Sequence, residues 1–171
     1  LALVQMNVLE IHVWGSTIKD LERPDRLVFD LDPGEGVSWD AMREAAVELR
    51  ERLLKMKLQS FLKTSGGKGL HVTVPVKPEV PWDVAKAFCK RVAGEMAGDS
   101  PARYLASMSK SRRKGRIFID YLRNGRGATA IAPYSTRARE GAPVAMPLAW
   151  DELPDVPSAA YFTVSTAPQR L

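Results

Sequence analysis

Two aspartates at the end of a hydrophobic run constrain the fold of this chain more than any other feature. The run Leu27-Val28-Phe29-Asp30-Leu31-Asp32 places β-forming residues directly before and between two acids. Residues i and i+2 of a strand share one face, with about 6.6 Å between their Cα atoms, so both carboxylates point the same way. Such a pair repels unless a divalent cation lies beside it. The motif therefore predicts a strand that ends at a metal site, although a strand running into an acidic turn is equally compatible with it.

A second hydrophobic run also ends in an acid. Ile117-Phe118-Ile119 leads into Asp120, which lies inside a segment rich in basic residues. Salt bridges to neighbouring arginines would account for a lone aspartate there. A third carboxylate beside Asp30 and Asp32 would instead suit two metal ions about 3.5–4 Å apart, the arrangement used for in-line displacement at phosphorus.

A glycine-rich segment, Ser65-Gly66-Gly67-Lys68-Gly69-Leu70-His71, connects two predicted strands. It is not a P-loop, because the spacing differs and a strand rather than a helix follows. Its backbone N–H groups and the side chains of Ser65, Lys68 and His71 could bind an anion. A plain hairpin loop with a structural histidine is the alternative.

Two further side chains could reach a phosphate or could be structural. His12 lies in the apolar run 8–14, which we expect to form a buried strand, and a lone histidine in such a strand is more often structural. Arg137 follows another predicted strand. Its guanidinium could bind a triphosphate through two nitrogens, or it could be an ordinary surface charge.

The net charge of +5 is unevenly distributed. Residues 103–139 contain ten Lys or Arg and one acid, a net charge of +9, whereas the rest of the chain has 15 basic and 19 acidic residues, or −4. A basic segment this concentrated indicates a polyanionic partner, such as the phosphates of DNA or of a nucleotide. The alternative is a solvated surface run.

The remaining pattern predicts one mixed α+β domain over residues 1–171. Apolar residues spaced three and four apart predict a helix over 39–56, with Ser38 as N-cap, and a second helix over 81–97. A shorter basic helical stretch should start at Pro101. We expect strands at 8–14, 26–31, 60–63, 70–76, 116–122 and 128–133, the last two joined as a hairpin by Asn124-Gly125.

Composition excludes several classes of protein. No run of about 18 apolar residues is present, so no membrane partner is expected. Cys89 is the only cysteine, which predicts no disulfide, a buried rather than catalytic thiol, and a reducing cytoplasmic location. No Ser-His-Asp or Cys-His pairing is visible, so covalent catalysis is not expected.

Together these motifs are more specific than any one alone. The order of Leu27 to Asp32, Gly69-Leu70-His71 and Ile117 to Asp120 resembles the three motifs of the archaeo-eukaryotic primase superfamily. Within it, the chain is similar to the polymerase domain of bacterial DNA ligase D over nearly its whole length. The similar strings are VLEIHVWGS, VFDLDP, KTSGGKGLHV, FIDYLRNGRGATAIAPYSTRAREGAPV and PLAWDEL.

The resemblance implies mixed sheets with flanking helices, a primase-like catalytic core, and an active-site sheet like that of RNA-recognition folds. It implies a metal-dependent nucleotidyltransferase of the polymerase or primase type that adds nucleotides, preferably ribonucleotides, to DNA 3′ ends in non-homologous end joining. Carried over by position, the catalytic and metal-binding residues would be Asp30, Asp32 and Asp120, with two Mn²⁺ or Mg²⁺ ions. The nucleotide-binding residues would be His12, Ser65, Lys68, His71, Arg113 and Arg137. Arg123 stands outside this set, because its position varies within the family.

The partners implied by the resemblance are DNA ends with a 5′-phosphate, nucleoside triphosphates, and a fused or associated ligase and Ku, in the cytoplasm and nucleoid of a bacterium. In the family an upstream stretch recognises the 5′-phosphate, and we expect this chain to lack it. Two rival functions stay open. A non-catalytic DNA-end-binding module would keep the basic segment but would not need three aspartates at strand ends. A metal-dependent phosphoesterase would need the acids but not a loop for a triphosphate.

Overall fold

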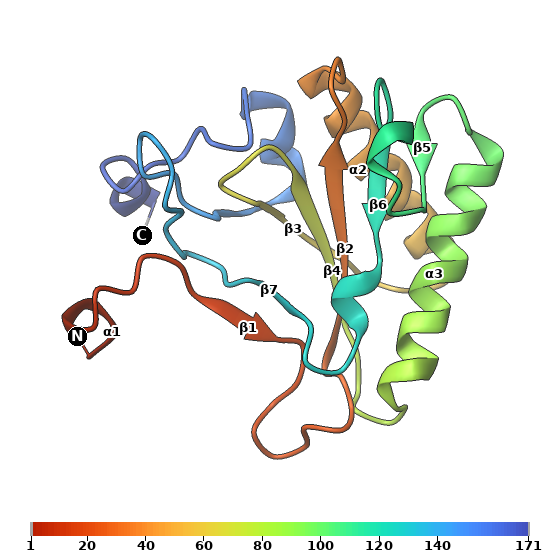
Figure 1. Cartoon of the computed structure of the whole chain (residues 1–171), viewed down its shortest axis with the longest axis horizontal. Helices are drawn as coiled ribbons and strands as arrows, with labels where there is room; N and C mark the ends of the chain where they lie inside the picture. Colours follow the sequence, from red (N-terminus) through yellow and green to blue (C-terminus); the bar gives the residue numbers. More distant parts are fainter. Residues whose placement is uncertain (1, 171) are drawn as a thin grey trace.

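A six-stranded sheet forms the centre of the molecule (Figure 1). The computed structural model describes residues 2–170, and the strands of this sheet follow the order β5-β6-β2-β4-β3-β8. Their bounds are β2 Arg26–Pro33, β3 Phe61–Thr64, β4 Leu70–Pro75, β5 Tyr104–Leu105, β6 Ile117–Asp120 and β8 Pro147–Leu148. All neighbours are antiparallel except β5 and β6, so the sheet is mixed and the fold is α+β, as the sequence predicts.

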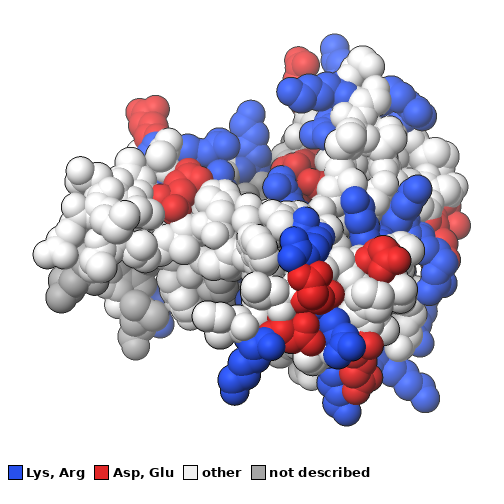
Figure 2. Space-filling model, turned by 60° about the horizontal axis from the view of Figure 1, so that its bottom comes forward, with Lys and Arg blue, Asp and Glu red and all other residues white. Residues whose placement is uncertain are grey.

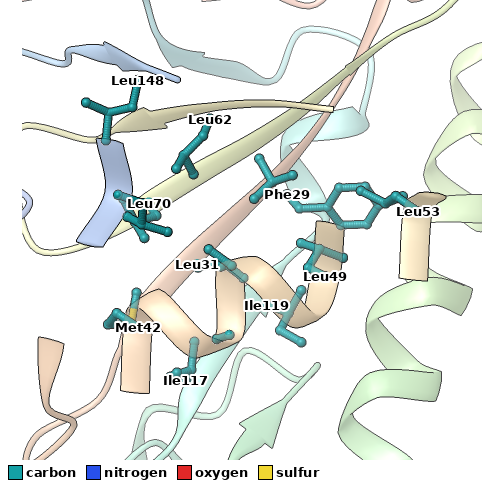
Figure 3. Close-up of a cluster of buried hydrophobic side chains, with 14 of the residues drawn as sticks. Phe29, Leu31, Met42, Leu49, Leu53, Leu62, Leu70, Ile117, Ile119 and Leu148 are labelled. Atoms are coloured by element: carbon teal, nitrogen blue, oxygen red, sulfur yellow. The ribbon is translucent and has the colours of Figure 1, made fainter. Parts of the chain in front are cut away.

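Two long helices cover one face of this sheet. Helix α2 spans Trp39–Lys55, and the Ser38 hydroxyl accepts a hydrogen bond from the Ala41 N–H at 3.2 Å, so the predicted N-cap is confirmed. Helix α3 spans Trp82–Asp99. Alternate residues of β2, among them Phe29 and Leu31, pack against the helices and are fully buried (Figure 3). Because side chains alternate along a strand, Val28, Asp30 and Asp32 face the other side.

The apolar run at 8–14 is not the buried strand that the sequence predicts. Residues Ala2–Gln5 form a short helix, α1, and only His12–Trp14 form a strand, β1. This strand pairs with β7, Thr129–Ile131, in a separate two-stranded sheet. Leu9 is 63% exposed, and the side chains of β1 are exposed as well. The prediction was wrong about burial because β1 has one neighbouring strand, and within residues 2–170 no second layer covers it.

The predicted hairpin at Asn124-Gly125 is also wrong. After β6 the chain makes a 3-10 turn, η2, over Leu122–Asn124, and β7 pairs with β1 instead of β6. The Asn124 side chain is buried, accepting from the Val28 N–H at 2.7 Å and donating to the Val28 carbonyl at 2.8 Å. Strand β6 pairs only with the last four residues of β2, so at Val28 the asparagine amide takes the place of a neighbouring strand.

The basic stretch after Pro101 is not a helix. Tyr104 and Leu105 form the edge strand β5, and a 3-10 turn, η1, follows at Lys110–Arg112. The Tyr104 hydroxyl donates to Glu48 of α2 at 2.7 Å, and Ile117 N–H donates to the Arg103 carbonyl at 2.8 Å. These long-range contacts hold the segment extended and override its local helical preference.

The C-terminal residues return to the core in short elements, the 3-10 turns η3 Trp150–Asp155 and η4 Ala167–Arg170. Phe162 is buried and Trp150 is half-buried, its indole N–H donating to the Ser60 carbonyl, whereas Tyr161 is exposed. Cys89 is fully buried, which raises the pKa of its thiol to about 12 and fits the predicted structural role. No helix among residues 2–170 is long and apolar enough to cross a membrane.

Candidate metal and nucleotide site

One row of side chains crosses four strands on the face of the sheet away from the helices. The strand register pairs Lys63 of β3 with His71 of β4, His71 with Asp30 of β2, and Asp30 with Asp120 of β6. Asp32 lies two residues further along β2 and therefore shares this face. Residues distant in the sequence are thus brought together by β-pairing alone.

The three aspartates converge as the sequence predicts. Asp30, Asp32 and Asp120 each offer a carboxylate oxygen, and these oxygens lie within 4.8 Å of one another. Asp120 is held in place because its Oδ1 accepts a hydrogen bond from the Leu122 N–H at 2.7 Å. Three carboxylates are a donor set suited to hard divalent cations such as Mg²⁺ and Mn²⁺.

The carboxylates carry more negative charge than their surroundings balance. Burial, followed by repulsion from Asp30 and Asp120, raises the pKa of Asp32 to about 6. Burial also raises the pKa of Asp120. Burial alone would raise the pKa of Asp30 as well, but nearby His71, Arg123 and Lys63 together outweigh it and lower that pKa. A divalent cation would relieve the repulsion at Asp32 and Asp120, so the triad fits a metal on electrostatic grounds.

Arg123 is the nearest counter-charge to the triad, and the sequence-based set omits it. Its Nε lies 3.3 Å from Asp30 Oδ2 and 3.3 Å from Asp120 Oδ2. The 3-10 turn after β6 makes this possible, because it brings residue 123 back beside residue 120. The i,i+3 spacing from Asp120 was a usable signal, but the expectation of a hairpin at Asn124 concealed it.

His71 and Lys63 are almost completely buried, although both are polar. His71 is 3% exposed, with Nε2 3.3 Å from Asp30 Oδ1, and burial lowers the pKa of its imidazole. Lys63 is 8% exposed, and its Nζ has no hydrogen-bond partner among residues 2–170. Lys63 was not predicted, since a lysine in a strand is ordinarily solvated.

A cavity of about 660 Å³ opens above the triad. Eight of the nine predicted site residues line it, and the ninth, Asp120, adjoins Asp30. The eight are His12, Asp30, Asp32, Ser65, Lys68, His71, Arg113 and Arg137. Three basic residues outside the predicted set also line it, namely Lys110, Arg123 and Arg139. A polyphosphate bound to metal would meet opposite charge on most sides of this cavity.

The glycine-rich loop is built around the Ser65 hydroxyl. This oxygen accepts hydrogen bonds from the N–H groups of Gly67 at 3.2 Å and Gly69 at 3.1 Å. Those two N–H groups are therefore engaged within the loop, and the expected backbone anion site is not formed by them. Position 66 requires glycine, because its φ is +64° and a Cβ there would lie 2.8 Å from Arg137 Cγ.

The basic segment 103–139 does not form one patch. Five of its ten basic residues line the cavity, namely Lys110, Arg113, Arg123, Arg137 and Arg139. Arg103 instead pairs with Glu44 and Glu48 of α2, and Arg126 pairs with Glu22. On the face seen in Figure 2, charged side chains of both signs mix over the part of the molecule that carries α3 and β6.

A second cavity, of about 350 Å³, adjoins the first between the two sheets. The two share His71, Arg123, Ala130 and Ile131 as lining residues. Its remaining walls are mostly apolar and include Val13, Trp14, Val28 and Pro147. The open face of the six-stranded sheet thus offers a charged compartment at the carboxylates and an apolar one beside it.

Comparison with known proteins places this geometry in a family. The family model described as "LigD, primase-polymerase domain" matches residues 1–171. The multifunctional non-homologous end joining protein LigD of Pseudomonas aeruginosa is 44% identical over 168 residues, which are 98% of this chain and 20% of that protein. The bifunctional LigD of Bacillus subtilis is 34% identical over 164 residues, 95% of this chain and 27% of that protein.

A solved structure agrees with these sequence comparisons. The polymerase domain from Mycobacterium tuberculosis ligase D in complex with DNA superposes with a TM-score of 0.84 at 38% identity, covering 90% of this chain and 56% of that one. The chain spans about a fifth to a quarter of the length of the curated relatives above. Because the family match covers every residue and is supported by both fold and identity, the chain belongs to the LigD primase-polymerase domain family.

Proposed function

We propose that this chain is a metal-dependent nucleotidyltransferase that adds nucleotides to DNA 3′ ends during non-homologous end joining. The observation that carries the proposal is the convergence of Asp30, Asp32 and Asp120 beside a cavity lined by basic side chains. Membership of the LigD primase-polymerase family supports the same reaction class. The P. aeruginosa relative is itself named a non-homologous end joining protein.

In this proposal the three aspartates hold two Mn²⁺ or Mg²⁺ ions. The chemistry that bound divalent ions supply in such sites is activation of a hydroxyl and stabilisation of charge on phosphorus oxygens. The primer 3′-hydroxyl would attack the α-phosphorus of a nucleoside triphosphate, forming the new P–O bond while pyrophosphate leaves. His71, whose Nε2 lies 3.3 Å from Asp30 Oδ1, would orient that carboxylate.

The remaining cavity residues divide into two proposed groups. Lys68 and Arg137, with Ser65 at the start of the glycine-rich loop, would bind the triphosphate and then the leaving pyrophosphate. His12 lies on the opposite wall, on β1, and would contact the same nucleotide. Arg113, whose guanidinium packs over the Phe118 ring at 4.1 Å, would contact phosphate at the other end of the cavity, beside Lys110.

Wider features of the family are carried into the proposal as well. We infer a preference for ribonucleotides, DNA ends with a 5′-phosphate as substrates, and cooperation with a ligase and Ku. The M. tuberculosis structure contains DNA, which supports a DNA substrate for this chain. The inferred location is the bacterial cytoplasm at the nucleoid.

The test is primer extension with Mn²⁺, using labelled DNA and either ribo- or deoxynucleoside triphosphates. We expect nucleotide addition that is stopped by Asp30→Ala and unaffected by Asp151→Ala, an exposed acid of η3. DNA binding without incorporation would favour a scaffold. Cleavage of DNA or nucleotide without extension would favour a phosphoesterase. Equal use of both nucleotide types would remove only the ribonucleotide preference.

A further inference from the structure

Glu10 lies behind the proposed nucleotide site, outside the set of residues assigned to it. Its Oε1 accepts two hydrogen bonds, from Arg137 Nε at 3.1 Å and from the Ala138 N–H at 2.9 Å. Its Oε2 lies 2.9 Å from His12 Nε2. One carboxylate therefore contacts both His12 and Arg137, two cavity-lining residues that are 125 positions apart in the sequence.

The contacts around Glu10 reach the glycine-rich loop through Arg137. While Nε of Arg137 donates to Glu10, its Nη1 donates to the Ser65 carbonyl at 2.6 Å. Two of the five N–H groups of the guanidinium are thereby fixed by the protein, and the other three remain for a ligand. Arg137 is held between the β1 segment and the loop that the sequence predicts to bind phosphate.

Hydrogen bonds on both sides of Glu10 fix its position along the chain. The Ile11 N–H donates to the Ser135 hydroxyl at 2.8 Å, and the Ala132 N–H donates to the Ile11 carbonyl at 2.8 Å. The Thr136 hydroxyl also bonds to the Leu9 carbonyl. The segments 9–12 and 132–138 are therefore joined on both sides of the carboxylate, so its position is set by the backbone.

We propose that Glu10 is a positioning residue of the nucleotide site, which holds Arg137 and His12 in place on the cavity wall before a triphosphate binds. The inference rests on the proposed function, because it takes the triphosphate as the ligand. Binding to a group that is already ordered avoids the entropy of immobilising a long side chain. The benefit should therefore appear in nucleotide affinity.

Because Glu10 is negatively charged, the direction in which its removal changes nucleotide affinity tests the proposal. Hydrogen bonds from His12 and then from Ala138 and Arg137 lower the pKa of Glu10 to about 2, so it is a carboxylate at neutral pH. A carboxylate beside a triphosphate repels it, and removing that charge would by itself strengthen nucleotide binding. Weaker binding by a folded variant after removal therefore points to lost positioning and not to the lost charge.

The experiment compares Glu10→Ala, Glu10→Gln and wild type in nucleotide titration and in steady-state extension with Mn²⁺. We expect Glu10→Ala to raise Kd and KM for the nucleotide about tenfold, with kcat at saturation changed less than about threefold. The glutamine oxygen can still accept from Arg137 and Ala138, and its NH₂ takes the place of Oε2 beside His12, so Glu10→Gln should restore affinity to within about threefold of wild type. In an Arg137→Ala background, Glu10→Ala should change the logarithm of the nucleotide Kd by less than half as much as it does in the wild-type protein.

Glu22→Ala is the matched control, because Glu22 also pairs with an arginine about a hundred residues away, Arg126, but outside the cavity. It should leave nucleotide affinity unchanged. Should Glu10→Ala fail to fold, Glu10→Asp replaces it, since the shorter carboxylate keeps the charge but cannot hold both partners, and several-fold weaker binding is expected. Unchanged or tighter nucleotide binding in Glu10→Ala or Glu10→Asp overturns the inference. Absence of nucleotide binding in wild type would instead overturn the proposed function.

Discussion

Lys63 places an ammonium group where water does not reach it. Its Nζ is buried without a hydrogen-bond partner among residues 2–170, in the row that continues through His71 to Asp30. Burial lowers the pKa of Lys63 to about 7, against the opposing attraction of Asp30. A group that titrates near neutral pH in the folded state and near pH 10.5 in the unfolded chain couples stability to pH.

Replacing Lys63 with Met should therefore stabilise the protein in a pH-dependent way. Below about pH 7 both states of the wild-type protein carry the proton, so the burial penalty is fully present. Between pH 7 and 10 the unfolded chain holds more protons than the folded one, so wild-type stability rises with pH. We expect Lys63→Met to gain a few kcal/mol at about pH 7, a gain that shrinks towards pH 10. Urea unfolding across this range measures it, with exposed Lys55→Met as control; a difference independent of pH would contradict it.

The aspartate triad should respond to divalent ions without any substrate. A ligand that binds only the folded state stabilises it by about 2.7 kcal/mol at a hundred times its Kd. We expect Mn²⁺ to raise the Tm of wild type, and Asp120→Asn to lose most of that rise because one ligand of the cluster is gone. Asp151→Asn, on the exposed turn η3, should keep it. An equal rise in both variants would place the bound ion elsewhere.

The sequence predicts the three aspartates and most of the cavity lining, but it misses several residues that contact them. Asp30, Asp32 and Asp120 end hydrophobic runs, so local alternation alone gives their face. Arg123 lies three residues after Asp120, a spacing that could have identified it, but Lys63 and Glu10 act through strand register and a contact across 127 residues. The contacts of Lys63 and Glu10 have no fixed spacing in the sequence, so no local pattern could identify these two residues.

Strand β2 depends on a side chain as well as on its neighbouring strands. Strand β4 pairs with it over residues 26–31, but β6 pairs only with residues 30–33. The Asn124 amide covers the gap at Val28, and it also donates to the Tyr121 carbonyl at 2.8 Å. The turn that contains Asn124 is thereby tied to the strand that carries Asp30.

Asn124→Ala should destabilise the fold by about 2–4 kcal/mol, because the N–H and carbonyl of Val28 would lose their partner while remaining buried. Chemical denaturation gives the difference in unfolding free energy. Gln59→Ala, at an exposed position, should change it by less than about 0.5 kcal/mol. A loss below about 1 kcal/mol at position 124 would mean that water replaces the amide.

Prediction succeeded for elements with their own periodicity. The helices α2 and α3 and the strands β2, β3 and β4 appear within a few residues of the predicted bounds. Failures fell where distant contacts decide the outcome. Asn124-Gly125 carries a hairpin signal, yet the amide of Asn124 forms two hydrogen bonds with Val28 and no two-residue turn forms. The hydrogen bond from the Tyr104 hydroxyl to Glu48 of α2 helps to hold Tyr104 in an edge strand.

At the scale of the molecule, basic side chains line the cavity, whereas elsewhere arginines such as Arg103 and Arg126 are paired with acids. Arg112 and Lys114 are exposed beside Arg113, at the end of the cavity formed by the segment between β5 and β6. Lys55 and Lys57 lie at the C-terminal end of α2, outside the cavity lining. The two groups therefore make different predictions for DNA binding.

Reversing Arg112, Arg113 and Lys114 to Glu should weaken DNA binding and flatten its dependence on salt. Each duplex phosphate contact contributes a log–log slope of about −0.9, so losing two contacts should change the slope by nearly 2. Fluorescence anisotropy over a range of KCl concentrations measures both quantities. Reversing Lys55 and Lys57 should have little effect, and Asp30→Ala should bind DNA without extending it. Equal losses in the two charge reversals would argue for attraction by net charge alone.

The walls of the cavity belong to sheets of very different size. Asp30 and His71 lie on inner strands of the six-stranded sheet, whereas His12 lies on a two-stranded sheet whose strands have three residues each. Amide hydrogens of β2 and β4 should therefore exchange with deuterium only through global unfolding, and those of β1 and β7 through frequent local opening. The wall that carries His12 is then the less stable side of the cavity, and the strands that carry the carboxylates are the more stable side. Triphosphate should accordingly suppress the local opening through which residues 10–14 and 129–137 exchange. Residues 27–31 should continue to exchange only through global unfolding.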